Sequence, residues 1–131
     1  MAKANPKYLK YTKEHEWVKV ENEIAIVGIT DHAQELLTSL VFVELPEIGK
    51  KVEQMKPLAV VESVKSVSDV YAPVSGEVVE VNISLTKKPE IINQDAFGKG
   101  WIARIRIADS KELGKLMDAD SYTEFCQKEK H

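Results

Sequence analysis

Lys65 differs from the other lysines of this chain because apolar, β-rich sequence approaches it from both sides. The stretch from Leu58 to Pro73 reads LAVVESVKSVSDVYAP. This pattern predicts two strands, over 58–63 and 66–71, that meet in a hairpin at Val64 and Lys65. A lysine at such a tip would hold its amine in water on a rigid support. A modifying enzyme needs such an amine, although an exposed hairpin lysine is also an ordinary surface residue.

The cysteine and the histidines of the chain show no spacing that is typical of a catalytic or metal site. Cys126 follows Phe125 in a predicted helix, and a small buried hydrophobe is the expected role. The three histidines, His15, His32 and His131, show no metal-ligand spacing, so no metal site is predicted. No converging nucleophile, base and oxyanion donors are found, which argues against an enzyme and for a non-catalytic protein.

Composition excludes several classes of protein. The chain has 131 residues, 44% of them hydrophobic, a net charge of −3 and a pI near 5.7. One domain is expected over 8–127, with tails at 1–7 and 128–131. The acidic balance argues against nucleic acid, and no apolar run approaches the ~18 residues of a membrane span. A single cysteine and no signal peptide favour a cytoplasmic protein, or a mitochondrial matrix protein in a eukaryote.

Local patterns predict a chain of short strands with small helices. Hairpin strands are expected over 16–20 and 24–30, followed by a helix capped by Asp31 with Gln34. Further strands are expected over 41–45, 77–82 and 101–107, and 82–100 is expected to be irregular. Capping boxes at Asp109 with Glu112, and at Ser121 with Glu124, predict a helix through Met117 and another in the tail.

The segments around Lys65 form two related halves, each a strand, a glycine turn and a further strand. Gly49 and Gly76 mark the two turns. No period repeats along the rest of the chain, so this is a single pseudo-twofold unit rather than a solenoid. We therefore expect a mainly β, mostly antiparallel protein with two small sheets packed together and short helices at the flanks.

Seven segments, in order, make the chain similar to a known family. They are YTKEHEW at 11–17, VGITDHAQ at 27–34, VFVELP at 41–46, VESVK at 61–65, SD at 68–69, YAPVSGE at 71–77 and GW at 100–101. The chain resembles the H proteins of the glycine cleavage system, in the group of lipoyl- and biotinyl-carrying domains, over nearly its whole length. The resemblance implies the barrel-sandwich hybrid fold. Thr38-Ser39 and Ala96-Phe97 depart from the family's usual residues.

The resemblance implies a lipoyl carrier with lipoate attached covalently to Lys65. It also implies that Glu62, Gly49 and Gly76 are presented to the lipoylating enzyme. Such a carrier takes the aminomethyl group of glycine from a pyridoxal-phosphate glycine decarboxylase to a tetrahydrofolate-dependent aminomethyltransferase. A flavoprotein (FAD) dihydrolipoamide dehydrogenase then reoxidises the arm. A carrier that visits several active sites in turn is expected to be a monomer.

The loaded arm carries a protonated amine and is prone to hydrolysis, so it benefits from a site that excludes water. A carboxylate could hold the amine by a charge-assisted hydrogen bond. We hypothesise that Asp69 and Glu16, together with His32, line a cleft that receives the arm. The alternative is that all three are solvated or capping residues.

Four other interpretations remain open at this point. A lipoyl domain of a 2-oxoacid dehydrogenase would be shorter and would usually show Asp-Lys-Ala at the tip, where this chain has Val64-Lys65-Ser66. An H-like protein that relays lipoyl groups to other enzymes is poorly separated by sequence. An enzyme would turn over glycine alone, and a structural adaptor would keep its function with Lys65→Arg.

Overall fold

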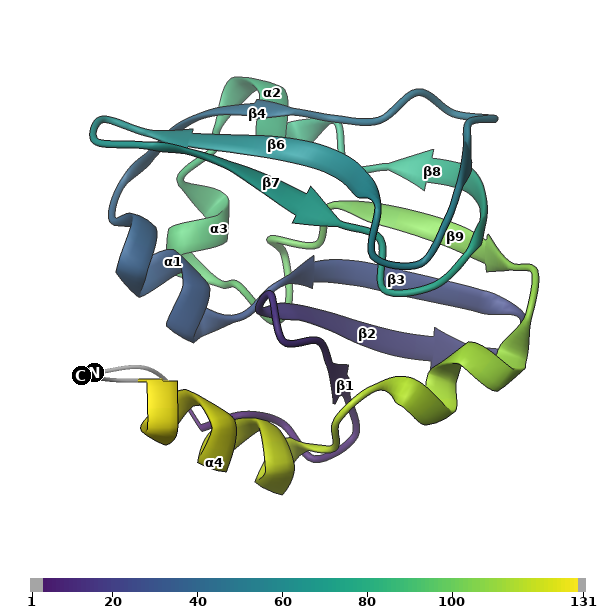
Figure 1. Cartoon of the computed structure of the whole chain (residues 1–131). Helices are drawn as coiled ribbons and strands as arrows, with labels where there is room; N and C mark the ends of the chain where they lie inside the picture. The colour runs from purple at the N-terminus through teal and green to yellow at the C-terminus, as the bar shows by residue number, and fades with distance from the viewer. Residues whose placement is uncertain (1–3, 130–131) are drawn as a thin grey trace.

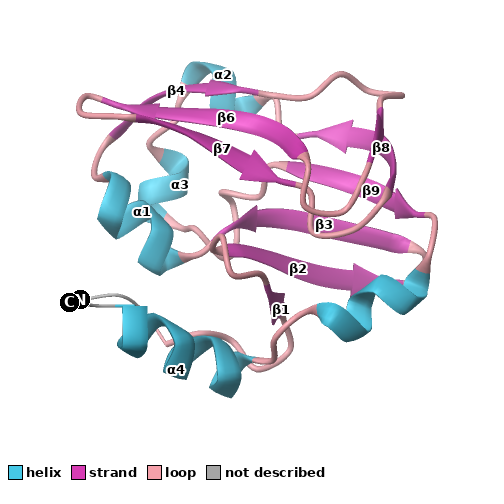
Figure 2. Cartoon of the chain, viewed as in Figure 1, coloured by secondary structure: helices cyan, strands magenta, loops and turns pink. Residues whose placement is uncertain are grey.

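A computed structural model describes residues 4–129 and shows a mainly β protein with short helices (Figures 1 and 2). The strands are β1 Lys10–Tyr11, β2 Glu16–Glu21, β3 Ile24–Ile29, β4 Leu40–Glu44, β5 Lys51–Val52, β6 Pro57–Ser63, β7 Val67–Tyr71, β8 Gly76–Val81 and β9 Ala103–Ile107. The helices are α1 Asp31–Leu37, α2 Ser84–Lys87, α3 Ile91–Gln94, a 3-10 helix at Ser110–Lys115, and α4 Ala119–Glu129.

The strands form two antiparallel sheets. One has six strands in the order β1-β2-β3-β9-β8-β5, and the other has three in the order β4-β6-β7. In Figure 1 the three-stranded sheet lies above the six-stranded one, and the tip of the β6–β7 hairpin projects at the same end as α1. The predicted fold class, two antiparallel sheets with flanking helices, is confirmed.

Apolar side chains hold the two sheets together. The main core takes residues from both sheets, with Val27, Val78 and Ile105 fully buried in the larger sheet and Val61 and Val70 nearly so in the smaller. Burial of each such side chain stabilises the fold by roughly 1.5–3 kcal/mol. The hairpin that carries Lys65 is therefore anchored at its base and free at its tip.

A second apolar cluster attaches the C-terminal helix to the edge of the larger sheet. Tyr11 of β1 stacks on Tyr122 of α4 with ring centroids 4.6 Å apart, and Trp17 and Cys126 belong to the same cluster. Backbone bonds between Tyr11 and Met117 join β1 to the chain just before α4. Figure 1 shows α4 below the larger sheet, at the side where β1 lies.

The predicted hairpins and strands agree with the structure, but the helix caps predicted at Asp31 and Ser121 were wrong, and the one at Asp109 was right only in part. The N-cap of α1 is Thr30, whose hydroxyl accepts a hydrogen bond from the Ala33 N–H, and Asp31 is the first helical residue. Ser121 lies inside α4, where its N–H donates to Asp118, so the Ser121 capping box does not exist.

The third correction concerns Glu112. Asp109 does cap the helix that follows, but that helix is 3-10 and ends at Lys115 rather than near Met117. Glu112 does not reach back to the cap: its carboxylate accepts from the N–H and hydroxyl of Ser75 at 2.7 and 2.8 Å. A contact between residues far apart in sequence thus replaces the expected local one.

The structure contains more helix than was predicted, in two places. The segment expected to be irregular over 82–100 contains α2 and α3, and α4 continues to Glu129, past the predicted domain end at 127. His131 and parts of the predicted tails lie outside the described residues. No helix in residues 4–129 is long and apolar enough to cross a membrane.

Candidate functional site

Lys65 lies at the exposed tip of the β6–β7 hairpin. The hairpin closes through the Ser63 N–H, which donates to the Ser66 carbonyl at 2.8 Å. The Ser63 hydroxyl oxygen accepts from the N–H groups of Lys65 and Ser66 at 3.3 and 3.2 Å. Since a serine hydroxyl can satisfy backbone groups that a tight turn leaves unpaired, Ser63 fixes the backbone beneath Lys65. The side chain of Lys65 is exposed, and the backbone that carries it is held by these hydrogen bonds.

A pocket opens on the side of this hairpin. It has a volume of about 200 Å³ and lies between the β1–β2 loop, α1 and β7. Its walls are formed by Glu14, His15, Ala33, Leu36, Leu37, Ser68, Asp69 and Tyr71. Helix α1 supplies an apolar wall, and the β1–β2 loop and β7 supply carboxylates. Asp69 and Glu14 are both exposed. The pocket therefore combines an apolar surface with two negative charges at solvent.

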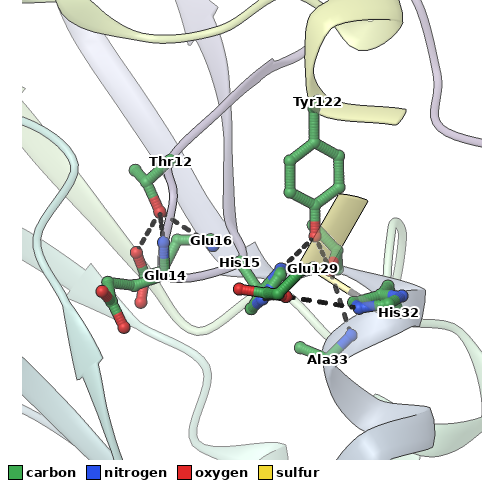
Figure 3. A network of polar contacts seen from close by, with 9 residues as sticks. Thr12, Glu14, His15, Glu16, His32, Ala33, Tyr122 and Glu129 are labelled. Carbon is green, nitrogen blue, oxygen red and sulfur yellow. Dashed lines mark hydrogen bonds and ion pairs between the residues drawn. The ribbon is translucent and has the colours of Figure 1, made fainter. Parts of the chain in front are cut away.

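Glu16, predicted beside Asp69, does not line this pocket. Its side chain is 1% exposed. Its carboxylate accepts from the Thr12 hydroxyl, as Figure 3 shows, and from the Tyr71 N–H at 3.0 Å. Burial raises the pKa of Glu16 from 4.5 to about 7, and the two hydrogen bonds oppose the rise only in part. Through Tyr71, this carboxyl holds the end of β7, the strand that leads away from Lys65.

His32 lies behind the pocket wall, in a polar cluster with His15. The two imidazole centroids are 4.9 Å apart. His15 Nδ1 is 2.7 Å from the Tyr122 hydroxyl and its Nε2 is 2.9 Å from Glu129 Oε1, as Figure 3 shows. His32 Nε2 is 4.0 Å from the same Glu129 oxygen. Of the two histidines, only His15 lines the pocket.

The three residues predicted to face the lipoylating enzyme lie in two places. Glu62 is half-buried on β6, beside the tip and opposite Val67. Gly49 and Gly76 lie by the β5–β8 pairing, in the other sheet, where each has a backbone reason to be glycine. Gly49 has φ of +95°, and a Cβ on Gly76 would lie 2.0 Å from the Arg106 carbonyl oxygen.

Known proteins resemble this chain over nearly its whole length. A model of the family described as glycine cleavage H-protein matches residues 9–129. The chain belongs to the glycine cleavage H-protein family. The glycine cleavage system H protein of Thermus thermophilus is 52% identical over 124 residues, covering 95% of this chain and 97% of the relative. That of Thermotoga maritima is 51% identical over 123 residues, covering 94% and 99%.

A solved H-protein structure has the same fold. The glycine cleavage system H protein of Mycobacterium marinum superposes with a TM-score of 0.86 at 37% sequence identity. The match covers 92% of this chain and 97% of that one. The family match over residues 9–129 thus includes the β1–β2 loop, α1 and β7, which line the pocket.

Of the eight residues that line the pocket, only Asp69 was predicted from the sequence, and Glu14 and His15 are among those that were missed. Glu14 and His15 precede β2 in a loop where His15 has φ of +74°. Glu14 lines the pocket from this loop, whereas Glu16, the first residue of β2, is buried. The available signal was their position in the matched H-protein segment YTKEHEW, next to Glu16.

Proposed function

We propose that this protein is a non-catalytic lipoyl carrier of the glycine cleavage system, with lipoate joined through an amide to Nζ of Lys65. The observation that carries the proposal is the placement of Lys65: an exposed amine on a hairpin fixed by Ser63, in a chain of the H-protein family. A bound lipoyl group would supply thiol–disulfide and group-transfer chemistry, while the protein supplies position and protection.

The surroundings of Lys65 fit recognition by a lipoylating enzyme. Val64 and Val67, on either side of the tip, are 79% and 66% exposed. Exposed apolar side chains clustered around a polar target are typical of a docking surface. Glu62 adds a carboxylate at the same edge. We assign recognition to Glu62 together with these valines, and a supporting role to Gly49 and Gly76, which shape the β5–β8 region.

The pocket beside β7 is the proposed resting place of the loaded arm. Asp69 lies four residues from Lys65 along an extended strand, a span of roughly 13 Å that a lysyl side chain lengthened by a lipoyl chain reaches. The apolar wall of α1 would exclude water from the cargo. Asp69 and Glu14 would accept hydrogen bonds from its protonated amine.

Glu16 and His32 serve this pocket indirectly in the proposal. Glu16 positions Tyr71 through the backbone bond at the end of β7. His32 packs against His15, which itself lines the pocket. Both are positioning residues rather than contacts of the arm.

The proposed partners are the enzymes that load, unload and reoxidise the arm. They are a pyridoxal-phosphate glycine decarboxylase, a tetrahydrofolate-dependent aminomethyltransferase and an FAD-dependent dihydrolipoamide dehydrogenase. Each must reach the same Lys65 in turn. A hairpin tip that stands clear of the body of a monomeric carrier allows all three to do so.

Lys65→Arg tests the function directly. Arginine keeps the positive charge and the exposed position but offers no amine for the amide bond. In an assay reconstituted with the three partners, tetrahydrofolate and NAD, the variant should give no glycine-dependent NADH. Lys56→Arg, an exposed lysine at the base of the same hairpin, is the matched control and should match wild type. Activity retained by Lys65→Arg would exclude the carrier function.

A further inference from the structure

Three metal-ligating side chains from distant parts of the sequence meet beside the arm pocket. His15 comes from the β1–β2 loop, His32 from the first turn of α1, and Cys126 from α4. One ligand atom of each, an imidazole nitrogen or the sulfur, lies within 4.8 Å of the other two. The side chains of His15 and His32 are 13% and 22% exposed, and Cys126 is 9% exposed. The cluster is thus sheltered and still reachable from solvent.

A carboxylate completes this cluster at its solvent side. Glu129 lies one turn after Cys126 on α4, and its Oε1 is 2.9 Å from His15 Nε2 and 4.0 Å from His32 Nε2. Figure 3 shows Glu129 reaching back from α4 toward both histidines. Two imidazoles, a thiol and a carboxylate form a borderline-soft donor set, which suits zinc better than magnesium or calcium.

The ring orientation of His15 is fixed by a neighbour, as in many metal sites. His15 Nδ1 is 2.7 Å from the Tyr122 hydroxyl, and that hydroxyl is in turn 2.7 Å from the Thr30 hydroxyl. In a metal-bound form, Nδ1–H would donate to Tyr122 and Nε2 would be the ligand atom, in place of its present contact with Glu129 Oε1. Metal-bound histidines usually donate their second ring N–H in this way, which sets the tautomer of the ligand.

We propose that His15, His32 and Cys126, with Glu129 as fourth ligand, bind a zinc-class divalent cation. Tetrahedral zinc has bonds of about 2.0–2.3 Å, which separates its ligand atoms by roughly 3.3–3.8 Å. The ligand atoms, now up to 4.8 Å apart, must therefore approach one another by at most about 1.0–1.5 Å, and the His15–Glu129 contact must open slightly. Binding converts the Cys126 thiol to a thiolate, and its proton passes to solvent.

Such a cation would fasten three elements next to the pocket. It would tie α4 to α1 and to the β1–β2 loop, and it would fix His15, which forms part of the pocket wall. Lys65 is not part of the cation site. A failed test of the cation proposal would therefore leave the carrier proposal unaffected, and the reverse also holds.

The test uses the full chain carrying Lys65→Arg, because a lipoyl dithiol would itself bind zinc. This protein, freed of metal with a chelator, is titrated with Zn²⁺ by calorimetry and with Co²⁺ by absorption spectroscopy. One equivalent of Zn²⁺ should bind and raise Tm by several degrees. Co²⁺ should give tetrahedral d–d bands and a thiolate-to-cobalt charge-transfer band.

Variants then identify the ligands. Adding Cys126→Ser should remove the charge-transfer band, and His32→Gln, near the surface, should weaken Zn²⁺ binding at least tenfold. Glu129→Gln should weaken it less, while Glu124→Gln on the same helix should leave it unchanged. Circular dichroism checks that each variant folds.

Three results would overturn the cation proposal. One is binding of Zn²⁺ only at millimolar concentration, and another is a cobalt complex without the charge-transfer band. The third is equal affinity in the His32→Gln and Glu124→Gln variants.

Discussion

Asp69 and Glu14 place two carboxylates at the pocket that we assign to the arm. Neither has a carboxylate-to-lysine ion pair among the described residues, so both are available to an incoming cation. An amine held between them would make charge-assisted hydrogen bonds, each worth about 1.5–3 kcal/mol. These residues, rather than the buried Glu16, are expected to set how long the aminomethyl cargo survives.

Asp69→Asn should shorten the lifetime of that cargo. Asparagine keeps the shape of the side chain but loses its charge, so spontaneous hydrolysis should speed up about tenfold. The rate is measured as formaldehyde or ammonia released from the loaded protein in the absence of tetrahydrofolate. Glu80→Gln, an exposed carboxylate of the other sheet, is the control. Equal rates in wild type and Asp69→Asn would remove Asp69 from the arm site.

Glu16 makes stability depend on pH near neutrality. Its pKa is about 7 in the folded protein, well above its ordinary 4.5, because the side chain is buried. Between these values the folded protein holds a proton that the unfolded chain has lost, so stability falls as pH rises through this window. The loss from this one group between pH 5 and pH 8 is about 2 kcal/mol.

Glu16→Gln should therefore flatten the pH profile. Glutamine cannot ionise, and it can still accept from the Tyr71 N–H and donate to Thr12. Urea unfolding at pH 5 and pH 8 should show a difference about 2 kcal/mol smaller than in wild type. Glu14→Gln, an exposed neighbour, should keep the wild-type difference. An unaltered profile in Glu16→Gln would show that this carboxyl is ionised in the folded protein throughout.

At the scale of elements, Gly76 decides whether β8 and β9 can pair. A Cβ there would meet the Arg106 carbonyl oxygen at 2.0 Å, and backbone cannot move aside as a flexible side chain can. Gly76→Ala should cost more than about 2 kcal/mol of unfolding free energy. Gly114→Ala, where nothing lies within 4 Å, is the matched control and should be neutral or slightly stabilising. Equal stability of the two variants in urea would contradict this account of the pairing.

Sequence patterns predicted strands better than helix caps, and the difference has a physical cause. Alternation around Lys65 directly reflects which face of β6 and β7 is buried. A helix cap, in contrast, depends on which nearby hydroxyl or carboxylate accepts the hydrogen bond from a free backbone N–H in the first turn. Thr30, rather than Asp31, accepts this bond in α1. Glu112 accepts from Ser75, which is distant in sequence, and so does not bond to the cap of its own helix.

At the scale of the whole molecule, the candidate site divides into local and assembled parts. The position of Lys65 depends on local sequence alone, because a single hairpin forms it, and its place at the hairpin tip was predicted. The pocket and the histidine cluster are assembled from the β1–β2 loop, α1, β7 and α4. Because these residues are far apart in sequence, their spacing does not show that they lie together in the fold, and the sequence therefore predicted neither a pocket role for His15 nor a metal site with Cys126.

Intact mass of the protein purified from its native host, with peptide mapping around Lys65, tests the central claim most directly. The account predicts an increment equal to one lipoyl amide, located on the peptide that contains Val64-Lys65-Ser66. Other lysines, including Lys56, should be unmodified. An unmodified Lys65 in lipoate-replete cells, or the increment on a different lysine, would contradict the assignment of this hairpin as the carrier site.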